Sequence, residues 1–68
     1  MVEIFKTNVQ DAAVANYIVE QLLERFPMYT INFDLEDCDK ILRIEGEKIN
    51  PALICSLVEQ RNVECWVL

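Results

Sequence analysis

The spacing of hydrophobic and polar residues changes six times along the chain, and each spacing predicts one element of secondary structure. The first element, Val2–Thr7, is rich in β-branched and aromatic residues and too short for a lone helix, which favours a strand. Because side chains alternate across a strand, either Val2 and Ile4 or Phe5 and Thr7 can face the core. The pattern of this segment leaves both alternatives open.

A helix is predicted from Asp11 to Phe26, where apolar residues recur every four positions. Asn8 or Asp11 can serve as its N-cap, and Pro27 disfavours helical geometry at Phe26, so that the helix ends there. The apolar stripe comprises Val14, Ile18, Leu22 and Phe26, flanked by Ala15, Val19 and Leu23.

Two strands follow, joined by a short charged turn. Tyr29, Ile31, Phe33 and Leu35 alternate with polar residues and form the predicted buried face of the second strand. Residues 36–40 are of types that commonly occur in turns. Leu42 and Ile44 then alternate with their neighbours in a third strand, which ends at Gly46. These segments are typical of a hairpin.

A second helix begins at Asn50 and Pro51, with proline at the first helical position, and is expected to run to about Arg61. Asn62 can adopt the left-handed conformation that closes a helix. In the last strand, Val63, Cys65 and Val67 are expected to face inward, and Glu64, Trp66 and Leu68 outward.

The resulting order, βαββαβ, predicts a single α+β domain over residues 1–68 with the ferredoxin-like sandwich fold. In that fold a four-stranded antiparallel sheet has the order 4-1-3-2, and both helices cover one face. The first strand-to-helix turn, the hairpin and the approach to strand four then share one end of the sheet. That end would carry Asp11, Asp37, Cys38, Asp39 and Asn62.

Charge and residue types exclude several functions. A net charge of −6 repels phosphate backbones, and no apolar run is long enough to span a membrane, so we expect neither nucleic-acid binding nor membrane insertion. The three cysteines fit no disulfide framework or CxxC metal spacing, which favours free thiols in the cytoplasm. With no histidine, one serine and no phosphate-binding glycine loop, we do not expect an enzyme.

Three segments resemble the heavy-metal-associated domain of copper chaperones and metal-transporting ATPases. INFDLE at 31–36, IEG at 44–46 and VEQRNV at 58–63 are similar to the V-x-V-x-L-E, V-x-G and I-E-x-x-G-Y stretches of that family. The G-M-x-C-x-x-C loop of the family would fall on residues 8–14, so that Asp11 and Val14 stand in place of its two metal-binding cysteines. Because Cu(I) requires thiolate or thioether ligands, the resemblance implies the scaffold without its usual metal site.

A metal site relocated to the hairpin is the alternative, with Asp11, Asp37, Cys38 and Asp39 as candidate ligands. Acidic residues in a hairpin more often form a solvated turn than a metal site. Zinc sites normally use three or four Cys or His ligands. We therefore expect Asp11 to be a helix cap, Val14 a core residue and Cys38 the exposed thiol. Cys55 and Cys65 are expected to be small core residues.

Trp66, Leu68 and Ile41 are predicted to lie on the sheet face that no helix covers, and Phe5 is a further candidate for that face. Exposed apolar surface and a strand edge are typical of protein contacts. The sequence therefore predicts a non-enzymatic interaction or regulatory module that binds a protein partner or a second copy through the open sheet face or the edge of strand four. The alternative is a heavy-metal-binding or transport-related protein with a relocated site.

Overall fold

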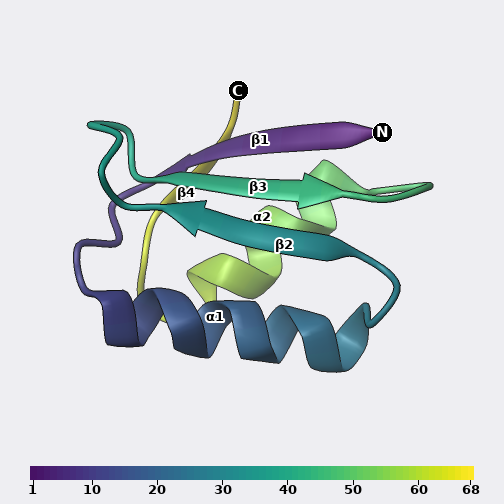
Figure 1. Cartoon of the computed structure of the whole chain (residues 1–68), viewed down its shortest axis with the longest axis horizontal. Coiled ribbons are helices and arrows are strands. Elements are labelled where there is room, and N and C mark those ends of the chain that lie inside the picture. The colour runs from purple at the N-terminus through teal and green to yellow at the C-terminus, as the bar shows by residue number, and fades with distance from the viewer.

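The computed structural model describes all residues from 1 to 68 and contains the six expected elements (Figure 1). They are β1 (Val2–Thr7), α1 (Ala12–Arg25), β2 (Thr30–Asp34), β3 (Ile41–Glu45), α2 (Pro51–Glu59) and β4 (Cys65–Val67). The sheet has the order β2-β3-β1-β4, and each neighbouring pair is antiparallel. This is the expected 4-1-3-2 order, so the ferredoxin-like fold is confirmed.

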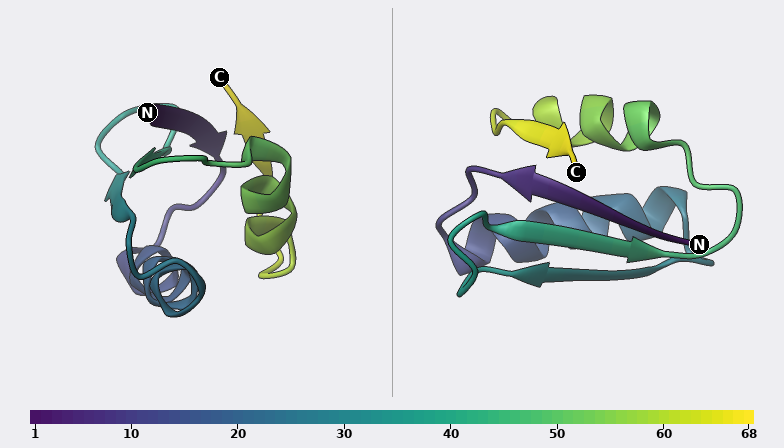
Figure 2. Two further views of the ribbon diagram at one scale, coloured as in Figure 1. Left: turned by 90° about the vertical axis from the view of Figure 1, so that its right-hand side faces the viewer. Right: turned by 90° about the horizontal axis from the view of Figure 1, so that it is seen from above.

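The two helices cover the same face of the sheet and leave the other face open. Figure 2 shows the sheet curving around α1 and α2, with α1 packed on β2 and α2 on β4. No helix in the structure combines the length and the apolar character needed to cross a membrane.

The strand pairings decide which face of β1 is buried. Phe5 lies opposite Leu42 of β3 and Val67 of β4, on the helix-covered side, and its side chain is fully buried. Thr7 is buried on the same side. The expectation that Phe5 contributes to the open face is therefore wrong, because its large ring fills the space between the sheet and the helices.

Side chains cap the N-terminus of each helix, as the sequence predicts. The Asp11 carboxylate accepts a hydrogen bond of 2.7 Å from the Ala13 N–H, and the Asn50 side chain accepts one of 3.2 Å from the Leu53 N–H. The second helix ends at Glu59 rather than near Arg61, because residues 60–62 form a turn instead of continuing the helix.

The core lies between the sheet and the helices. Its buried hydrophobic residues are Phe5, Val9, Ala15, Ile18, Leu22, Tyr29, Ile31, Leu42, Ile44, Ile49, Ile54, Val58 and Cys65. Val14 is half-buried and packs against this core, so its expected place is confirmed. Val67 was expected to face inward, yet it is 47% exposed. It lies on the same side as Cys65, but near the chain end on an edge strand, where less of the fold covers it.

Candidate functional site

The turn between β1 and α1 is held in place by the chain's own hydrogen bonds. The buried Thr7 hydroxyl donates to the Lys40 carbonyl at 2.6 Å and accepts from the Val9 N–H at 3.2 Å. The Asn8 amide donates to a Glu64 carboxylate oxygen at 3.0 Å and accepts from the Glu64 N–H at 2.7 Å. These bonds join the first turn to the hairpin and to the approach to β4, which confirms that the three segments share one end of the sheet.

The first turn does not fit a Cu(I) ion. Asp11 offers a hard carboxylate that already caps α1, and the apolar side chain of Val14 packs against the core. Neither residue supplies the soft sulfur ligand that Cu(I) requires. The turn therefore has no ligand set for that ion.

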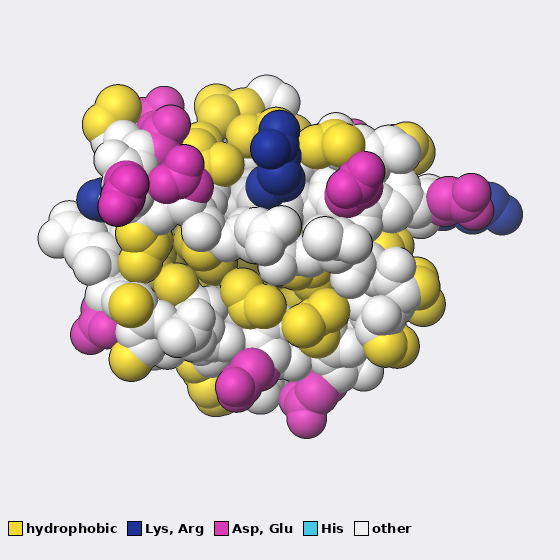
Figure 3. Space-filling view, viewed as in Figure 1, with side chains coloured by type: hydrophobic (Ala, Val, Ile, Leu, Met, Phe, Trp, Pro, Cys, Tyr) yellow, Lys and Arg dark blue, Asp and Glu magenta, His cyan; other side chains and the backbone are white.

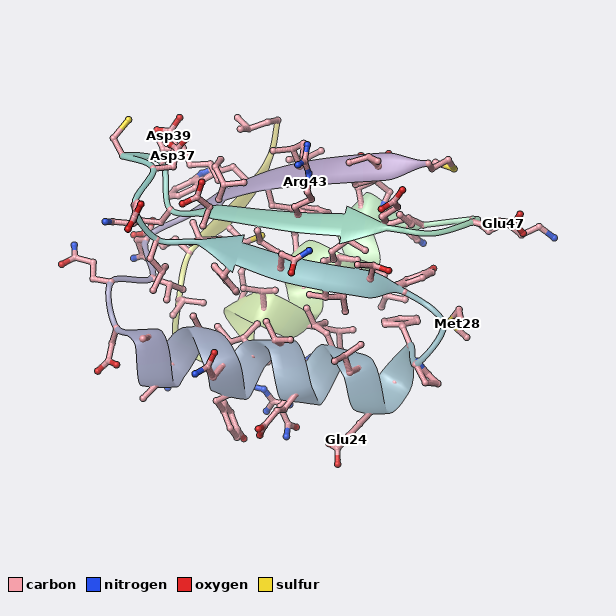
Figure 4. The ribbon with its side chains drawn as sticks, in the orientation of Figure 1. Glu24, Met28, Asp37, Asp39, Arg43 and Glu47 are labelled. Atoms are coloured by element: carbon pink, nitrogen blue, oxygen red, sulfur yellow. The ribbon has the colours of Figure 1, made fainter.

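The hairpin between β2 and β3 brings together three of the four candidate metal ligands. One ligand atom each of Asp37, Cys38 and Asp39 lies within 4.8 Å of the others, and Asp11 does not join this group. Two of these carboxylates have other roles: Asp37 accepts a hydrogen bond of 2.8 Å from the Asp39 N–H, and Asp39 pairs with Lys6 at 3.7 Å. The labelled Asp37 and Asp39 lie at the tip of the hairpin, at one end of the sheet (Figure 4). The hairpin is therefore an acidic turn held by its own hydrogen bonds and by the ion pair with Lys6.

The open face of the sheet contains a hollow of about 590 Å³ next to this hairpin. Ile4, Ile41 and Leu68 supply apolar side chains to the hollow, and Arg43 lines it as well. Figure 4 shows the labelled Arg43 on β3, and the space-filling view in the same orientation shows basic and hydrophobic side chains next to one another on this side of the molecule (Figures 3 and 4). The sequence predicts no hollow in so small a domain, because the residues that line it come from separate segments of the chain that only the fold brings together.

Acidic groups form the rim of the hollow on the hairpin side. Asp34, Asp37 and Asp39 all line it. Lys6 is the one basic residue within ion-pairing distance of any carboxylate in the structure, and its partner is Asp39. Its ammonium group also lies 5.8 Å from the ring centre of Trp66, which is 45% exposed on the same face of the sheet. The hollow thus combines apolar side chains with a predominantly negative rim.

A smaller hollow of about 350 Å³ lies between the two helices. Arg61 lines it and donates a hydrogen bond of 2.9 Å to the Gln21 side chain, while its guanidinium lies 5.6 Å from the ring centre of Tyr17. No cysteine, serine or histidine lines this hollow. It offers no nucleophile.

The three cysteines occupy different environments. Cys38 is exposed at the hairpin, Cys55 is half-buried on α2, and Cys65 is buried on β4. The sulfur atoms of Cys55 and Cys65 lie 3.2 Å apart. Burial raises the pKa of the Cys65 thiol strongly, and the hydrogen bond with Cys55 and the charges of Cys55 and Glu59 raise it further. The sequence places both residues in the core but does not reveal their contact, because their spacing matches no known motif.

The architecture is that of a ferredoxin-like α+β domain. The solved structure of the yeast copper transporter domain CCC2A, determined in apo and Cu(I)-loaded states, matches it with a TM-score of 0.82. The match covers 98% of this chain and 93% of the yeast domain at 16% sequence identity. No protein-family model matches the chain, and no curated protein is significantly similar to it in sequence. The comparison therefore confirms the fold that the resemblance implied.

Proposed function

We propose that this chain is a small protein-binding module without catalytic activity, and that its open sheet face binds a basic surface of another protein. The hollow on that face, with its apolar side chains and acidic rim, is the observation that carries the proposal. In this proposal, the fold that the chain shares with a copper transporter domain serves to bind a protein, and the first turn binds no metal.

The apolar part of the surface would supply most of the binding energy. Leu68 is 65% exposed and Trp66 is 45% exposed. Ile4 and Ile41 extend the same surface across β1 and β3. Exposed apolar patches of this kind usually mark a contact, and tryptophan is a frequent anchor of protein interfaces.

The charges of the surface favour a basic partner over a second copy of the chain. The hollow is lined by three carboxylates, those of Asp34, Asp37 and Asp39, and by the guanidinium of Arg43, and Lys6 pairs only with Asp39. A second copy would bring the same negative rim and the same net charge of −6, and the two copies would repel each other. Complementary charges raise the rate of association and exclude wrong partners.

Metal binding at the hairpin is the second candidate, and the grouping of Asp37, Cys38 and Asp39 is the observation that favours it. We place it second because both carboxylates are already engaged and because two carboxylates and one thiol suit neither zinc nor Cu(I) well. Titration of the reduced protein with Cu(I), Zn(II) and Ni(II), followed by amide NMR shifts, separates the two functions. Submicromolar binding that is lost in Cys38→Ser would establish the metal site.

Two exposed apolar residues provide a matched pair for testing the surface. Leu68→Asp places a carboxylate in the proposed interface, and Met28→Asp makes the same change at a residue that is 71% exposed near the opposite end of the sheet (Figure 4). Cross-linking in an extract of the source cells would recover partners of the wild-type chain. Each recovered protein is then purified and titrated with all three forms by calorimetry.

A genuine partner should bind Leu68→Asp at least about 10-fold more weakly than wild type, because an anchor is replaced by a desolvated charge. Met28→Asp should bind within about 2-fold of wild type, and raising the salt from about 50 to about 300 mM should weaken binding. Equal affinity for Leu68→Asp and wild type would refute the proposal. If sedimentation shows that the wild-type chain is a dimer and that Leu68→Asp is a monomer, the occupant of this face is a second copy of the chain and not a basic protein.

A further inference from the structure

Two thiols from different elements are in contact at the edge of the sheet, outside the proposed partner surface. Cys55 lies in the middle of α2, and Cys65 lies at the start of β4 on the side that faces the helices. Their sulfur atoms are 3.2 Å apart, whereas a disulfide bond is about 2.05 Å long. On oxidation, a side-chain rotation that brings the sulfurs roughly 1.2 Å closer would therefore reach the length of a disulfide bond.

We propose that Cys55 and Cys65 are the site of a reversible intramolecular disulfide, formed by exchange with a small-molecule disulfide such as oxidised glutathione. The Cys55 thiolate attacks one sulfur of the oxidant, forms a mixed disulfide and releases one thiolate. The Cys65 thiolate then attacks the Cys55 sulfur and releases the second. The two protein thiols lose two electrons and two protons, and the oxidant becomes two thiol molecules.

Burial assigns the order of the two attacks. Cys55 is half-buried whereas Cys65 is only 5% exposed, so Cys55 is the more accessible of the two residues to an oxidant in solution. The raised pKa of Cys65 favours its protonated thiol, which makes Cys65 the less reactive of the two toward an oxidant. Cys65 is thus the resolving thiol and Cys55 the attacking thiol.

The disulfide would tie an edge strand to the helix that covers it. β4 has three residues and pairs with β1 alone, so few backbone bonds hold it in the sheet. The bond would also close the segment that ends α2, including Asn62, whose φ of 64° is in the left-handed region. Oxidation would therefore restrain α2, this turn and β4 as one unit.

The exposed thiol of Cys38 would compete with this reaction by forming mixed or intermolecular disulfides. The test accordingly uses the Cys38→Ser protein, equilibrated with defined ratios of reduced and oxidised glutathione, quenched with acid and analysed by intact mass. The same measurement is made in urea, where the fold no longer brings the thiols together. A wild-type sample with Cys38 alkylated in advance serves as the form without substitutions.

We expect the folded protein to lose about 2 Da, the mass of two hydrogen atoms, and to yield a linked Cys55–Cys65 peptide on digestion. Because the thiols are separated by 10 positions and already in contact, the equilibrium constant for oxidation should be about 100-fold higher in the folded protein than in urea. With Cys65→Ser added, the reaction should stop at a mixed disulfide on Cys55. With Cys55→Ser added, Cys65 should stay unmodified while circular dichroism shows a folded chain.

The inference is overturned if folded Cys38→Ser protein keeps both thiols at a glutathione ratio that oxidises the chain in urea. It is equally overturned if the folded protein yields a mixed disulfide or a dimer as its final product. If either double variant fails to fold, the alkylated wild-type sample decides the outcome, since it retains both thiols of the pair.

Discussion

Gly46→Ala should destabilise the fold because of a single close contact. A β-carbon on Gly46 would clash with Cδ1 of the Tyr29 ring and lie 2.9 Å from its Cε1, well inside van der Waals contact. The ring cannot easily move away, because it stacks on Phe26 with centroids 5.0 Å apart and its hydroxyl donates to the Lys48 carbonyl at 3.2 Å. No other feature of Gly46 requires glycine, since its φ is not positive.

Two opposing terms determine the magnitude. Overpacking a fixed side chain costs about 1–3 kcal/mol. Replacing glycine by alanine restricts the unfolded chain and would stabilise the protein by about 0.4–1 kcal/mol if the ring were absent. We therefore expect Gly46→Ala to lower the free energy of unfolding by about 1–2 kcal/mol, which corresponds to a fall in Tm of roughly 5–15 °C for a domain of this size.

The assay is urea unfolding followed by far-ultraviolet circular dichroism, with wild type, Gly46→Ala, Tyr29→Ala and the double variant. Tyr29→Ala removes the ring and is itself destabilising, but in that background Gly46→Ala should be neutral or stabilising. The sign of the Gly46→Ala effect should thus differ between the two backgrounds. If Gly46→Ala stabilises wild type as much as it stabilises Tyr29→Ala, the assigned contact does not exist.

Three further predictions concern the first turn and the buried thiol. Thr7→Val should lower the free energy of unfolding by about 1–3 kcal/mol in urea, because the Lys40 carbonyl and the buried Val9 N–H lose their partner, and an unchanged midpoint would contradict these bonds. Asp11→Ala should lower the free energy of unfolding by about 1 kcal/mol, and Asp11→Asn should lower it much less, because asparagine also caps helices. Equal losses in the two variants would show that the charge of Asp11, and not its cap, stabilises the helix. Burial raises the pKa of Cys65 in the folded state above its unfolded value of about 8.5. The folded state therefore holds this proton more tightly than the unfolded state, so the free energy of unfolding is unaffected below that pH and falls as the pH rises above it. Above about pH 9 the free energy of unfolding should fall by up to about 1.4 kcal/mol per pH unit, and this slope should be smaller in Cys65→Ala; identical slopes would show that burial does not hold the proton.

The order of elements and the sheet topology follow from sequence because local patterns specify them. The alternation of β2 and β3 and the cap residues Asp11 and Asn50 mark elements that the structure contains with small shifts at their ends. The buried face of β1 could not be derived in this way. Both faces of that strand carry apolar residues, and only its pairing with β3 and β4 places Phe5 toward the helices.

The candidate sites depended more strongly on tertiary structure. The grouping of Asp37, Cys38 and Asp39 followed from their adjacency in the hairpin. The contact between Cys55 and Cys65 depends on how α2 packs on β4, which no local pattern encodes. The hollow on the open face likewise depends on tertiary structure, because residues of three strands, the hairpin and the end of β4 line it together.

The position of Trp66 determines what the intrinsic fluorescence of this protein can report. It is the only tryptophan in the chain, and it lies on the open sheet face and not in the core. Its emission should therefore change modestly on unfolding but respond to any molecule that covers this face. Lys6 lies near both the indole ring and the Asp39 carboxylate, so an ion or a partner at the hairpin that displaces Lys6 should also alter the emission. The chain thus carries its own optical probe at the surface where its binding function is proposed.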